Sequence, residues 1–437
     1  MPSTSLTTDR LRDIGVVGAG GAGFPTYQKL SSQAEVLILN AAECEPLLHK
    51  DKELLVHFAT EILEGMLQVA EMVAATRSVV AIKEKYTSLI ETLRPLANGR
   101  GIEIHLLPDS YPAGDEFITV YEVTGRVIPP GGLPGDVGCL VQNVETILNI
   151  QRNVPVTQKY LCVVGDVPNP VTLCVPIGTS YRDVFASCGM DPAKVEHVQV
   201  GGVMMGKVMQ SLDEVVTRTT GGLLCFPHDH VVARKHTATK QQRDLIGKSA
   251  CDQCSFCTEL CPRYLLGHPV EPHVAMRSLE FNRMGNEPLL GSQFCCECNL
   301  CTMYACPEDL FPSFATIDNK RQMRAEGKTH QVTGRTDLPV HSMMEYRKVP
   351  VSSLIKKLGL AKYKNVGPLT DFGPLPKEVR IPLQQHIGAP AVACVKVGDS
   401  VQVGDPIGRA PEGLGVAVHA SIQGTVVQVG DSIHIRA

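Results

Sequence analysis

The sequence predicts an α/β multidomain chain, and three observations lead to that prediction. The chain has 437 residues, enough for about three domains of ordinary size. In its first third, short apolar runs alternate with segments of helical periodicity, a pattern typical of sheets that helices cover on both faces. Nine of its 16 cysteines fall between Cys251 and Cys306, and short β patterns return in the C-terminal tail.

Composition and charge exclude several classes of protein. Hydrophobic residues make up 43% of the chain and charged residues 20%, as in an ordinary globular protein. The net charge of −4 lacks the basic excess that nucleic-acid binding leaves. No apolar run approaches the roughly 18 residues of a membrane span, and residues 1–5 lack the features of a secretory signal. We therefore expect a cytoplasmic protein with no membrane span and no nucleic-acid partner.

Residues 1–155 are predicted to form the first α/β domain. Residues 36–39 are a buried apolar run of strand length, and residues 53–75 carry apolar side chains at helical spacing. A strand at 79–82, a short helix near 88–93 and a strand at 102–107 continue this alternation. Alternating strands and helices predict a parallel sheet.

A glycine-rich loop follows the first apolar run. It has the spacing Gly18-x-Gly20-x-x-Gly23, which lets a backbone approach a phosphate before a helix N-terminus. This motif is weak by itself, and a plain tight turn is the alternative. The acidic segment 40–46 follows the next predicted strand, at the place where ribose-binding acids usually lie. Together, the loop and the acids favour a site for a nucleotide-like cofactor.

Residues 156–225 are predicted to form a small domain of the order β–turn–β–α–β. The strands fall at 160–164, 171–175 and 198–203, and residues 166–170 have turn chemistry. Ser180 and Asp183 form a capping-box pattern that opens the helix between the second and third strands.

The cysteine-rich region, residues 245–320, contains two runs. Cys251-x2-Cys254-x2-Cys257-x3-Cys261-Pro262 has the spacing of bacterial ferredoxins, in which three thiolates bind one [4Fe–4S] cluster and the fourth binds its neighbour. A zinc site is the alternative, although zinc typically uses two separated C-x2-C elements.

The second run departs slightly from this spacing. Cys295, Cys298, Cys301 and Cys306 keep the first two intervals but have one extra residue before the last cysteine, and Cys296 is a spare or substitute ligand. We predict a second [4Fe–4S] cluster here, with one cluster and a degenerate site as the alternative. Crossed ligation predicts the sets Cys251, Cys254, Cys257, Cys306 and Cys295, Cys298, Cys301, Cys261.

The remaining chain is predicted to be a linker and a small β domain. Residues 321–375 are polar and basic and indicate a linker with little core. Residues 376–437 contain short β patterns, and the sequence Val-Gly-Asp-Ser at 397–400 recurs at 429–432. This repeat predicts two similar halves that close one small sandwich.

Several motifs together resemble one family of electron-transfer proteins. Residues 18–26 with Lys29, and residues 40–46 with Asp51, resemble the flavin loop and acidic segment of the NADH-binding subunit of respiratory complex I and of the Rnf complex C subunit. Further counterparts lie at 111–116, 131–134, 142–146 and 201–206. The resemblance implies a Rossmann-like flavin domain, a β-grasp domain that binds soluble ligands, a two-cluster ferredoxin-like helical domain and a C-terminal barrel-sandwich hybrid.

The resemblance also implies the cofactor contacts. FMN rather than NAD occupies the loop in this family, and the nicotinamide of NADH stacks on the flavin. The residues implied to contact FMN are Gly18, Gly20, Gly21, Gly23, Lys29, Asn40, Asp51 and Asn143. Glu43 and Glu45 are assigned to the flavin and NADH face.

The position of the sandwich module refines the resemblance. The module comes last in this chain, whereas it precedes the flavin domain in the Rnf protein. That order resembles the cobalamin reductases of propanediol-utilisation microcompartments. It implies reduction of cob(III)alamin by NADH through FMN and two clusters in support of a B12-dependent diol dehydratase, inside a bacterial microcompartment. The implied partners are cobalamin or a corrinoid-handling adenosyltransferase, and a shell protein. The alternatives are an Rnf-like protein that serves ferredoxin and a non-catalytic electron-transfer scaffold.

The predicted cofactors complement each other chemically. NADH gives up two electrons as a hydride, whereas an iron–sulfur cluster accepts one electron at a time. A flavin exchanges electrons in both ways and therefore converts between them. No general-base dyad or nucleophile is required, and we assign no catalytic side chain.

Overall fold

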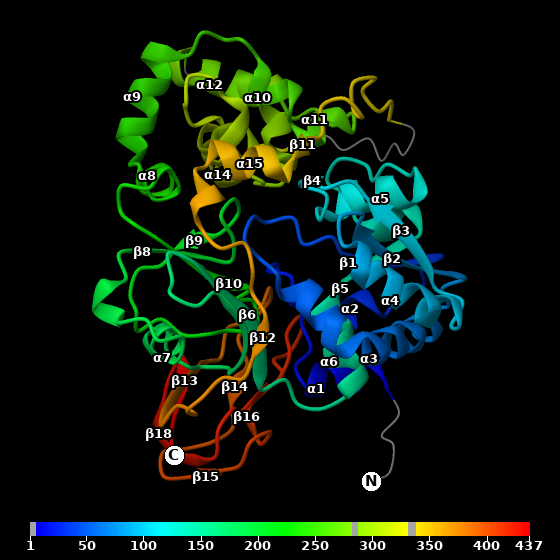
Figure 1. Ribbon diagram of the computed structural model, residues 1–437, viewed down its shortest axis with the longest axis vertical. Coiled ribbons are helices and arrows are strands. Elements are labelled where there is room, and N and C mark those ends of the chain that lie inside the picture. The colour runs from blue at the N-terminus through cyan, green and yellow to red at the C-terminus, as the bar shows by residue number, and fades with distance from the viewer. Residues whose placement is uncertain (1–5, 282–286, 331–337) are drawn as a thin grey trace.

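The computed structural model describes residues 6–281, 287–330 and 338–437. The first five residues, in which the sequence shows no secretory signal, lie outside this part. Figure 1 shows the N-terminal α/β region beside a green sheet, the helical cysteine-rich region above them and the red C-terminal module below the green sheet. In the described part of the chain, no helix combines the length and apolar character that crossing a bilayer would take.

The N-terminal region is built on a four-stranded sheet of order β3-β2-β1-β5. All of its pairs are parallel, which confirms the predicted sheet. Alternate residues of β1 enter two separate cores, Leu37 and Leu39 on one face and Val36 and Ile38 on the other. Helices therefore cover both faces. The strands are β1 (Val36–Ala41), β2 (Arg77–Lys83), β3 (Glu103–Leu107) and β5 (Cys139–Asn143), and the helices are α1 (Thr8–Asp13), α2 (Thr26–Lys29), α3 (Lys50–Met72), α4 (Thr87–Asn98), α5 (Glu116–Thr124) and α6 (Val144–Arg152).

The second region is a six-stranded sheet of order β12-β7-β6-β10-β8-β9, in which β6 and β10 are parallel neighbours. Its helix α7 (Tyr181–Ser187) begins where predicted, because the Ser180 side chain accepts a hydrogen bond from the Asp183 amide at 3.1 Å. The strands are β6 (Gln158–Gly165), β7 (Val171–Pro176), β8 (His197–Val200), β9 (Lys207–Val208), β10 (Gly222–Phe226) and β12 (Leu369–Thr370).

The predicted linker packs more tightly than expected. Within it, β11 (Val349–Pro350) pairs with β4 (Ser110–Tyr111), and β12 extends the second sheet. Leu354 of helix α15 (Val351–Lys357) is fully buried in a core shared with the cysteine-rich region. The expectation of little core is therefore wrong for this part of 321–375. The paired strands are only two residues long, too short to leave a periodic signal in the sequence.

The cysteine-rich region consists of short helices and loops, as predicted. Prolines occupy the first turns of α11 and α14, where the missing amide hydrogen costs nothing. The helices are α8 (Val231–Thr237), α9 (Lys240–Ala250), α10 (Phe256–Glu259), α11 (Pro262–Leu265), α12 (Pro272–Phe281), α13 (Glu287–Leu290) and α14 (Pro312–Ala325).

The C-terminal module has two small sheets, of orders β13-β19-β18-β15 and β14-β16-β17, around an aliphatic core. This arrangement confirms the predicted sandwich. The connection at 411–415 is fixed to the flavin-loop region, since Arg12 Nε donates to the Gly415 carbonyl at 3.2 Å and Tyr27 Oη to the Gly413 carbonyl at 3.3 Å. The strands are β13 (Glu378–Pro382), β14 (Val392–Ala393), β15 (Ser400–Val401), β16 (Pro406–Arg409), β17 (Val418–His419), β18 (Gly424–Val429) and β19 (Ser432–Arg436).

Candidate functional site

The glycine loop forms a tight turn before α2. The Gly18 amide donates to the Phe24 carbonyl at 2.9 Å, and the Gly23 amide donates to the Gly18 carbonyl at 3.2 Å. Gly21 and Gly23 have φ values of +117° and +67°, in the left-handed region that favours glycine. A Cβ on Gly21 would meet no atom within 4 Å, so this side of the loop is open.

The loop meets the carboxyl ends of two strands. Asn40 of β1 and Asn143 of β5 are register neighbours, and a Cβ on Gly20 would lie 3.4 Å from the Asn143 Cβ. The Asn40 side chain donates to the Gly114 carbonyl at 2.8 Å, which brings the 111–116 motif to the same edge. Open α/β sheets bind ligands at this edge of the strands. The structure thus brings together the predicted residues Gly20, Asn40 and Asn143.

Asp51 lies beneath this edge in a buried charge network. Its carboxylate accepts from Asn143 Nδ2 at 2.7 Å and pairs with Lys50 Nζ at 2.7 Å. Lys50 also pairs with Glu145 at 2.9 Å. Burial opposes the charge on Lys50, but Asp51 and Glu145 outweigh it and raise the pKa of Lys50 above its usual value. Asp51 therefore fixes the orientation of the Asn143 side-chain amide.

The acidic segment connects the first two regions. The Glu45 carboxylate accepts hydrogen bonds from the amides of Met204 at 2.8 Å and Met205 at 2.9 Å. Burial raises the pKa of Glu45 to about 7, while these amides favour its charged form. Burial, and then the neighbouring Asp51, raise the pKa of Glu43 to about 8. The 201–206 loop and the acids therefore share one face, as their joint resemblance implied.

Lys29 lies apart from this buried network. It is half-buried and pairs at 3.5 Å with Glu116 of the 111–116 motif. Sequence analysis missed Lys159, a fully buried lysine of β6 whose Nζ donates to the Ala19 carbonyl at 3.2 Å. Its one signal was a charged residue immediately before the apolar run at 160–164.

These residues fit a flavin mononucleotide. The loop has no side chain in the way at Gly20 and Gly21, the two asparagines place polar groups at the same edge for a ring system, and Lys29 offers a positive charge. The open space beside Gly21 leaves room for a phosphate-bearing group.

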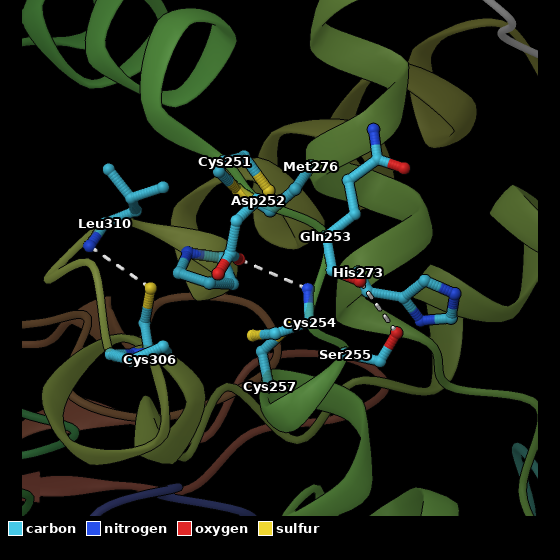
Figure 2. Close-up of a pocket in the computed structure, with 12 residues that line it drawn as sticks. Cys251, Asp252, Gln253, Cys254, Ser255, Cys257, His273, Met276, Cys306 and Leu310 are labelled. Atoms are coloured by element: carbon cyan, nitrogen blue, oxygen red, sulfur yellow. Dashed lines mark hydrogen bonds between the residues drawn. The ribbon is translucent and has the colours of Figure 1, made fainter.

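One group of cysteines lines a cavity (Figure 2). Cys251, Cys254, Cys257 and Cys306 line it, which is the first crossed set predicted from the spacing. Cys257 and Cys306 are buried, whereas Cys254 is exposed. Across the described ranges, no three His, Cys, Asp or Glu side chains converge on one metal-ion position. Four thiols around a chamber fit a [4Fe–4S] cluster in their chemistry and number.

The other cysteines form a second group deeper in the molecule. Burial, followed by the neighbouring Cys296, raises the pKa of Cys261 to about 12. Burial raises the pKa of Cys301 further, with Cys295, Cys257 and Cys261 adding to the shift. Cys261 of the first run thus has Cys296 of the second run among its neighbours, and Cys301 has Cys257 and Cys261 among its own. The second group comprises Cys261, Cys295, Cys296, Cys298 and Cys301, and it fits a second cluster with one thiol to spare.

This second group adjoins the 111–116 motif of the first region. Tyr111 Oη donates to the Cys298 carbonyl at 2.7 Å. Arg263, which follows the first run, forms an ion pair of 2.9 Å with Asp115. These contacts join the 111–116 motif directly to the second cysteine group.

Family models match three parts of the chain. The Nuo51 FMN-binding domain matches residues 11–152, a 4Fe-4S dicluster domain matches 250–311, and the RnfC barrel sandwich hybrid domain matches 362–437. The chain is therefore a mixed α/β multidomain protein with an FMN-binding domain, a two-cluster domain and a barrel-sandwich hybrid. Together, fold and site define a flavin- and iron–sulfur-dependent oxidoreductase.

The relatives narrow this class. The chain is 42% identical over 433 residues to the cobalamin reductase PduS of Salmonella typhimurium, covering 97% of this chain and 94% of that protein. It is 31% identical over 264 residues to the C subunit of the proton-translocating ferredoxin:NAD(+) oxidoreductase complex of Clostridium ljungdahlii, covering 58% of this chain and 55% of that one. The chain belongs to the PduS family of cobalamin reductases.

A solved structure shows a related fold. A chain of the NAD+-reducing [NiFe]-hydrogenase in the H2-reduced state matches with a TM-score of 0.50 and 20% identity. The match covers 78% of this chain and 64% of the hydrogenase chain. At this identity, the match supports the fold alone.

Proposed function

We propose that this oxidoreductase carries electrons from NADH, through FMN and two [4Fe–4S] clusters, to cobalamin, taking cob(III)alamin to lower oxidation states. The observation that carries the proposal is the arrangement of the cysteines. One group adjoins the flavin-loop region through Tyr111 and Cys298, and the other lines a cavity that reaches the surface at Cys254.

This arrangement supports an order for the electron path. Electrons enter at the flavin loop, pass to the cluster of Cys261, Cys295, Cys298 and Cys301, and leave through the cluster of Cys251, Cys254, Cys257 and Cys306. Cys257 of the first group is among the neighbours that raise the pKa of Cys301 in the second group, so we propose direct transfer between the two clusters. The exposed Cys254 supports exit to an acceptor at the surface.

The FMN site is proposed at the edge where the glycine loop meets β1 and β5. When bound, FMN supplies the conversion between hydride transfer and single-electron transfer. The chain would bind and orient it: the open loop at Gly20 and Gly21 would face the phosphate, Lys29 would add positive charge, and Asp51 holds the Asn143 side chain. Glu43 and Glu45 line the NADH side. The proposed FMN contacts are Gly18, Gly20, Gly21, Gly23, Lys29, Asn40, Asp51 and Asn143.

We assign domains along the chain on the same basis. The first sheet supports a Rossmann-like FMN and NADH domain over 1–155. The second sheet supports a β-grasp domain over 156–225. Within that segment β6 is the first strand and β10 the last, and the two lie side by side and parallel in the centre of the sheet. The cluster domain spans 245–320, the connecting segment 321–375, and the barrel-sandwich domain 376–437.

The relative also suggests a cellular context. PduS is named a cobalamin reductase, and we propose that this chain likewise supports a B12-dependent diol dehydratase in propanediol degradation. We place it in the cytoplasm within a bacterial microcompartment. Its proposed partners are a corrinoid-handling adenosyltransferase and a shell protein.

One anaerobic preparation tests the proposal. We expect about one FMN and about eight irons per chain after reconstitution, as two [4Fe–4S] clusters require. Mixing with NADH should then reduce cob(III)alamin, with the rise of the cob(II)alamin spectrum as the readout. Reduction of ferredoxin alone would favour the Rnf-like alternative, which the matched RnfC module makes a fair competitor. Bound cofactors without NADH oxidation would indicate a non-catalytic scaffold.

A further inference from the structure

The β6 lysine, Lys159, reaches out of its own sheet into the flavin-loop region. It is 1% exposed, and its Nζ contacts both the Ala19 carbonyl and the Glu145 carboxylate. We propose that Lys159 is a positioning residue for the flavin, which fixes the glycine loop and balances the buried charge beneath it. This inference rests on the proposed binding of FMN at the loop.

The loop residue Ala19 is held at both of its backbone groups. Its carbonyl accepts from Lys159 Nζ at 3.2 Å, and its amide donates to Thr146 Oγ1 at 3.0 Å. Gly18 and Gly20, on either side of Ala19, are predicted FMN contacts. Lys159 therefore fixes the part of the loop from which backbone amides would face the phosphate.

The charge network gives Lys159 a second role. Glu145 Oε2 accepts from Lys159 and, at 2.9 Å, from Lys50, while its Oε1 accepts from the Tyr160 amide at 3.1 Å. Lys50 in turn pairs with Asp51 at 2.7 Å. Two cations thus balance two carboxylates, and all four side chains are buried.

Glu145 keeps Lys159 charged in this setting. Burial lowers the pKa of Lys159 to about 8, and the carboxylate of Glu145 opposes that effect. In return, Lys159 and Lys50 outweigh the burial of Glu145 and lower its pKa. With a pKa of about 8, Lys159 still holds its proton at neutral pH, and the lowered pKa of Glu145 keeps the carboxylate ionised beside it.

Removing Lys159 should leave one uncompensated negative charge below the loop. In a buried, low-dielectric setting, that charge repels a phosphate dianion and opposes the addition of electrons to a nearby ring system. The loss of a charged donor also frees the Ala19 carbonyl and loosens the loop. Lys159 thus connects the second domain to the affinity and reduction potential of the flavin.

The test compares Lys159→Met with the charge-balanced double variant Lys159→Met/Glu145→Gln in the reconstituted full chain. For Lys159→Met we expect FMN binding weakened about tenfold or more, since a hydrogen bond to a charged group is lost, and a lower midpoint potential of the bound flavin. The double variant should recover the potential but not the full affinity, because the loop contact stays absent. FMN fluorescence titration and spectroelectrochemistry measure the two quantities.

Two further variants keep the outcome interpretable. Lys159→Arg retains the charge, so its flavin potential should stay close to that of the unmodified chain even if Lys159→Met folds poorly. Lys235→Met removes a buried lysine of α8, outside the flavin region, and should leave the flavin potential unchanged. An unmodified chain that binds no FMN would refute the proposed function itself. Normal FMN binding, with the same affinity and potential in Lys159→Met, would overturn this inference alone.

Discussion

The hydroxyl of Tyr111 donates a hydrogen bond of 2.7 Å to the backbone carbonyl of Cys298, and this bond joins the flavin-loop region to the second cysteine group. Tyr111 is buried in a core that also contains Cys298 and receives Cys44 and Cys296 at its margin. Burial, followed by the nearby Glu45, raises the pKa of Tyr111, so its hydroxyl remains a donor at neutral pH. The proposed electron path therefore crosses from the FMN-binding domain to the cluster domain where this hydrogen bond joins them.

Tyr111→Phe should destabilise the chain by about 1–2 kcal/mol, because the Cys298 carbonyl loses a buried partner. Denaturant unfolding of the reconstituted protein measures this loss. Tyr346→Phe serves as the control, since Tyr346 is 80% exposed. Equal stability of the two variants would show that the bond contributes nothing to joining the domains.

Two glycines of the loop should respond differently to alanine. At Gly20 a Cβ would meet Asn143 at an ordinary 3.4 Å, so Gly20→Ala should fold normally yet bind FMN at least tenfold more weakly. At Gly23 the φ of +67° and a Cβ only 2.8 Å from Thr219 Cγ2 add strain, so Gly23→Ala should also lose about 1–3 kcal/mol of stability without FMN. Flavin-free melting curves and FMN titrations separate the two effects. If Gly20→Ala bound FMN as tightly as the unmodified chain, the FMN phosphate would not lie at this part of the glycine loop.

Serine variants should identify the cluster ligands. Cys306→Ser should lose one cluster and lower the iron content from about eight to about four atoms per chain. Because Cys295 keeps the ferredoxin spacing to Cys298, Cys296→Ser should retain both clusters, whereas Cys295→Ser should not. Iron analysis and electron paramagnetic resonance of the reduced protein provide the readout. Loss of a cluster in Cys296→Ser, but not in Cys295→Ser, would exchange the roles of these two cysteines.

Stability should fall more when only Arg263 of the partly buried Arg263–Asp115 pair is replaced than when both residues are replaced. The pair is 2.9 Å long, and the Arg263 guanidinium lies 3.6 Å from the Phe117 ring centroid. Arg263→Met should cost about 1–3 kcal/mol, since it leaves the partly buried Asp115 carboxylate without its ion pair.

Adding Asp115→Asn to Arg263→Met tests that explanation. Asparagine removes the charge but keeps an oxygen that can cap α5, where Asp115 now accepts from the Phe117 amide at 3.0 Å. The double variant should recover part of the lost stability in urea unfolding. A double variant as unstable as Arg263→Met would show that packing on Phe117, not charge, is the main contribution.

Glu43 should make stability fall as the pH rises. Burial, and then Asp51, raise its pKa from 4.5 to about 8 in the folded chain. Between these two values the folded state holds a proton that the unfolded state has lost, so raising the pH favours unfolding. Glu43→Gln removes this titration and should gain up to about 4 kcal/mol over the unmodified chain as the pH rises from about 5 to about 8, at roughly 1.4 kcal/mol per pH unit. Parallel pH dependence of the melting temperatures of the two flavin-free proteins would contradict the buried, protonated state of Glu43.

Features that depend on local spacing could be predicted from the chain alone. The interval of three residues between cysteines predicts cluster binding because the ligands of one loop are close in the chain. Apolar periodicity predicted β1, α3 and the strands β6, β7 and β8 of the second sheet, but not β9, β10 or β12. Ser180 predicted the start of α7, because these features depend on neighbours within a turn or two.

Only the folded molecule shows which surfaces that are distant in the sequence come into contact. The fold joins Lys159 to Ala19 across 140 positions and Glu45 to Met204 across 159. It also buries Leu354 in a segment whose polar composition had predicted a linker. Periodicity shows that a side chain is to be buried, but not against which partner, because the partner is selected by the packing of whole domains. The cofactors could therefore be inferred from the chain, whereas the proposed order of the electron path rests on contacts that only the fold shows.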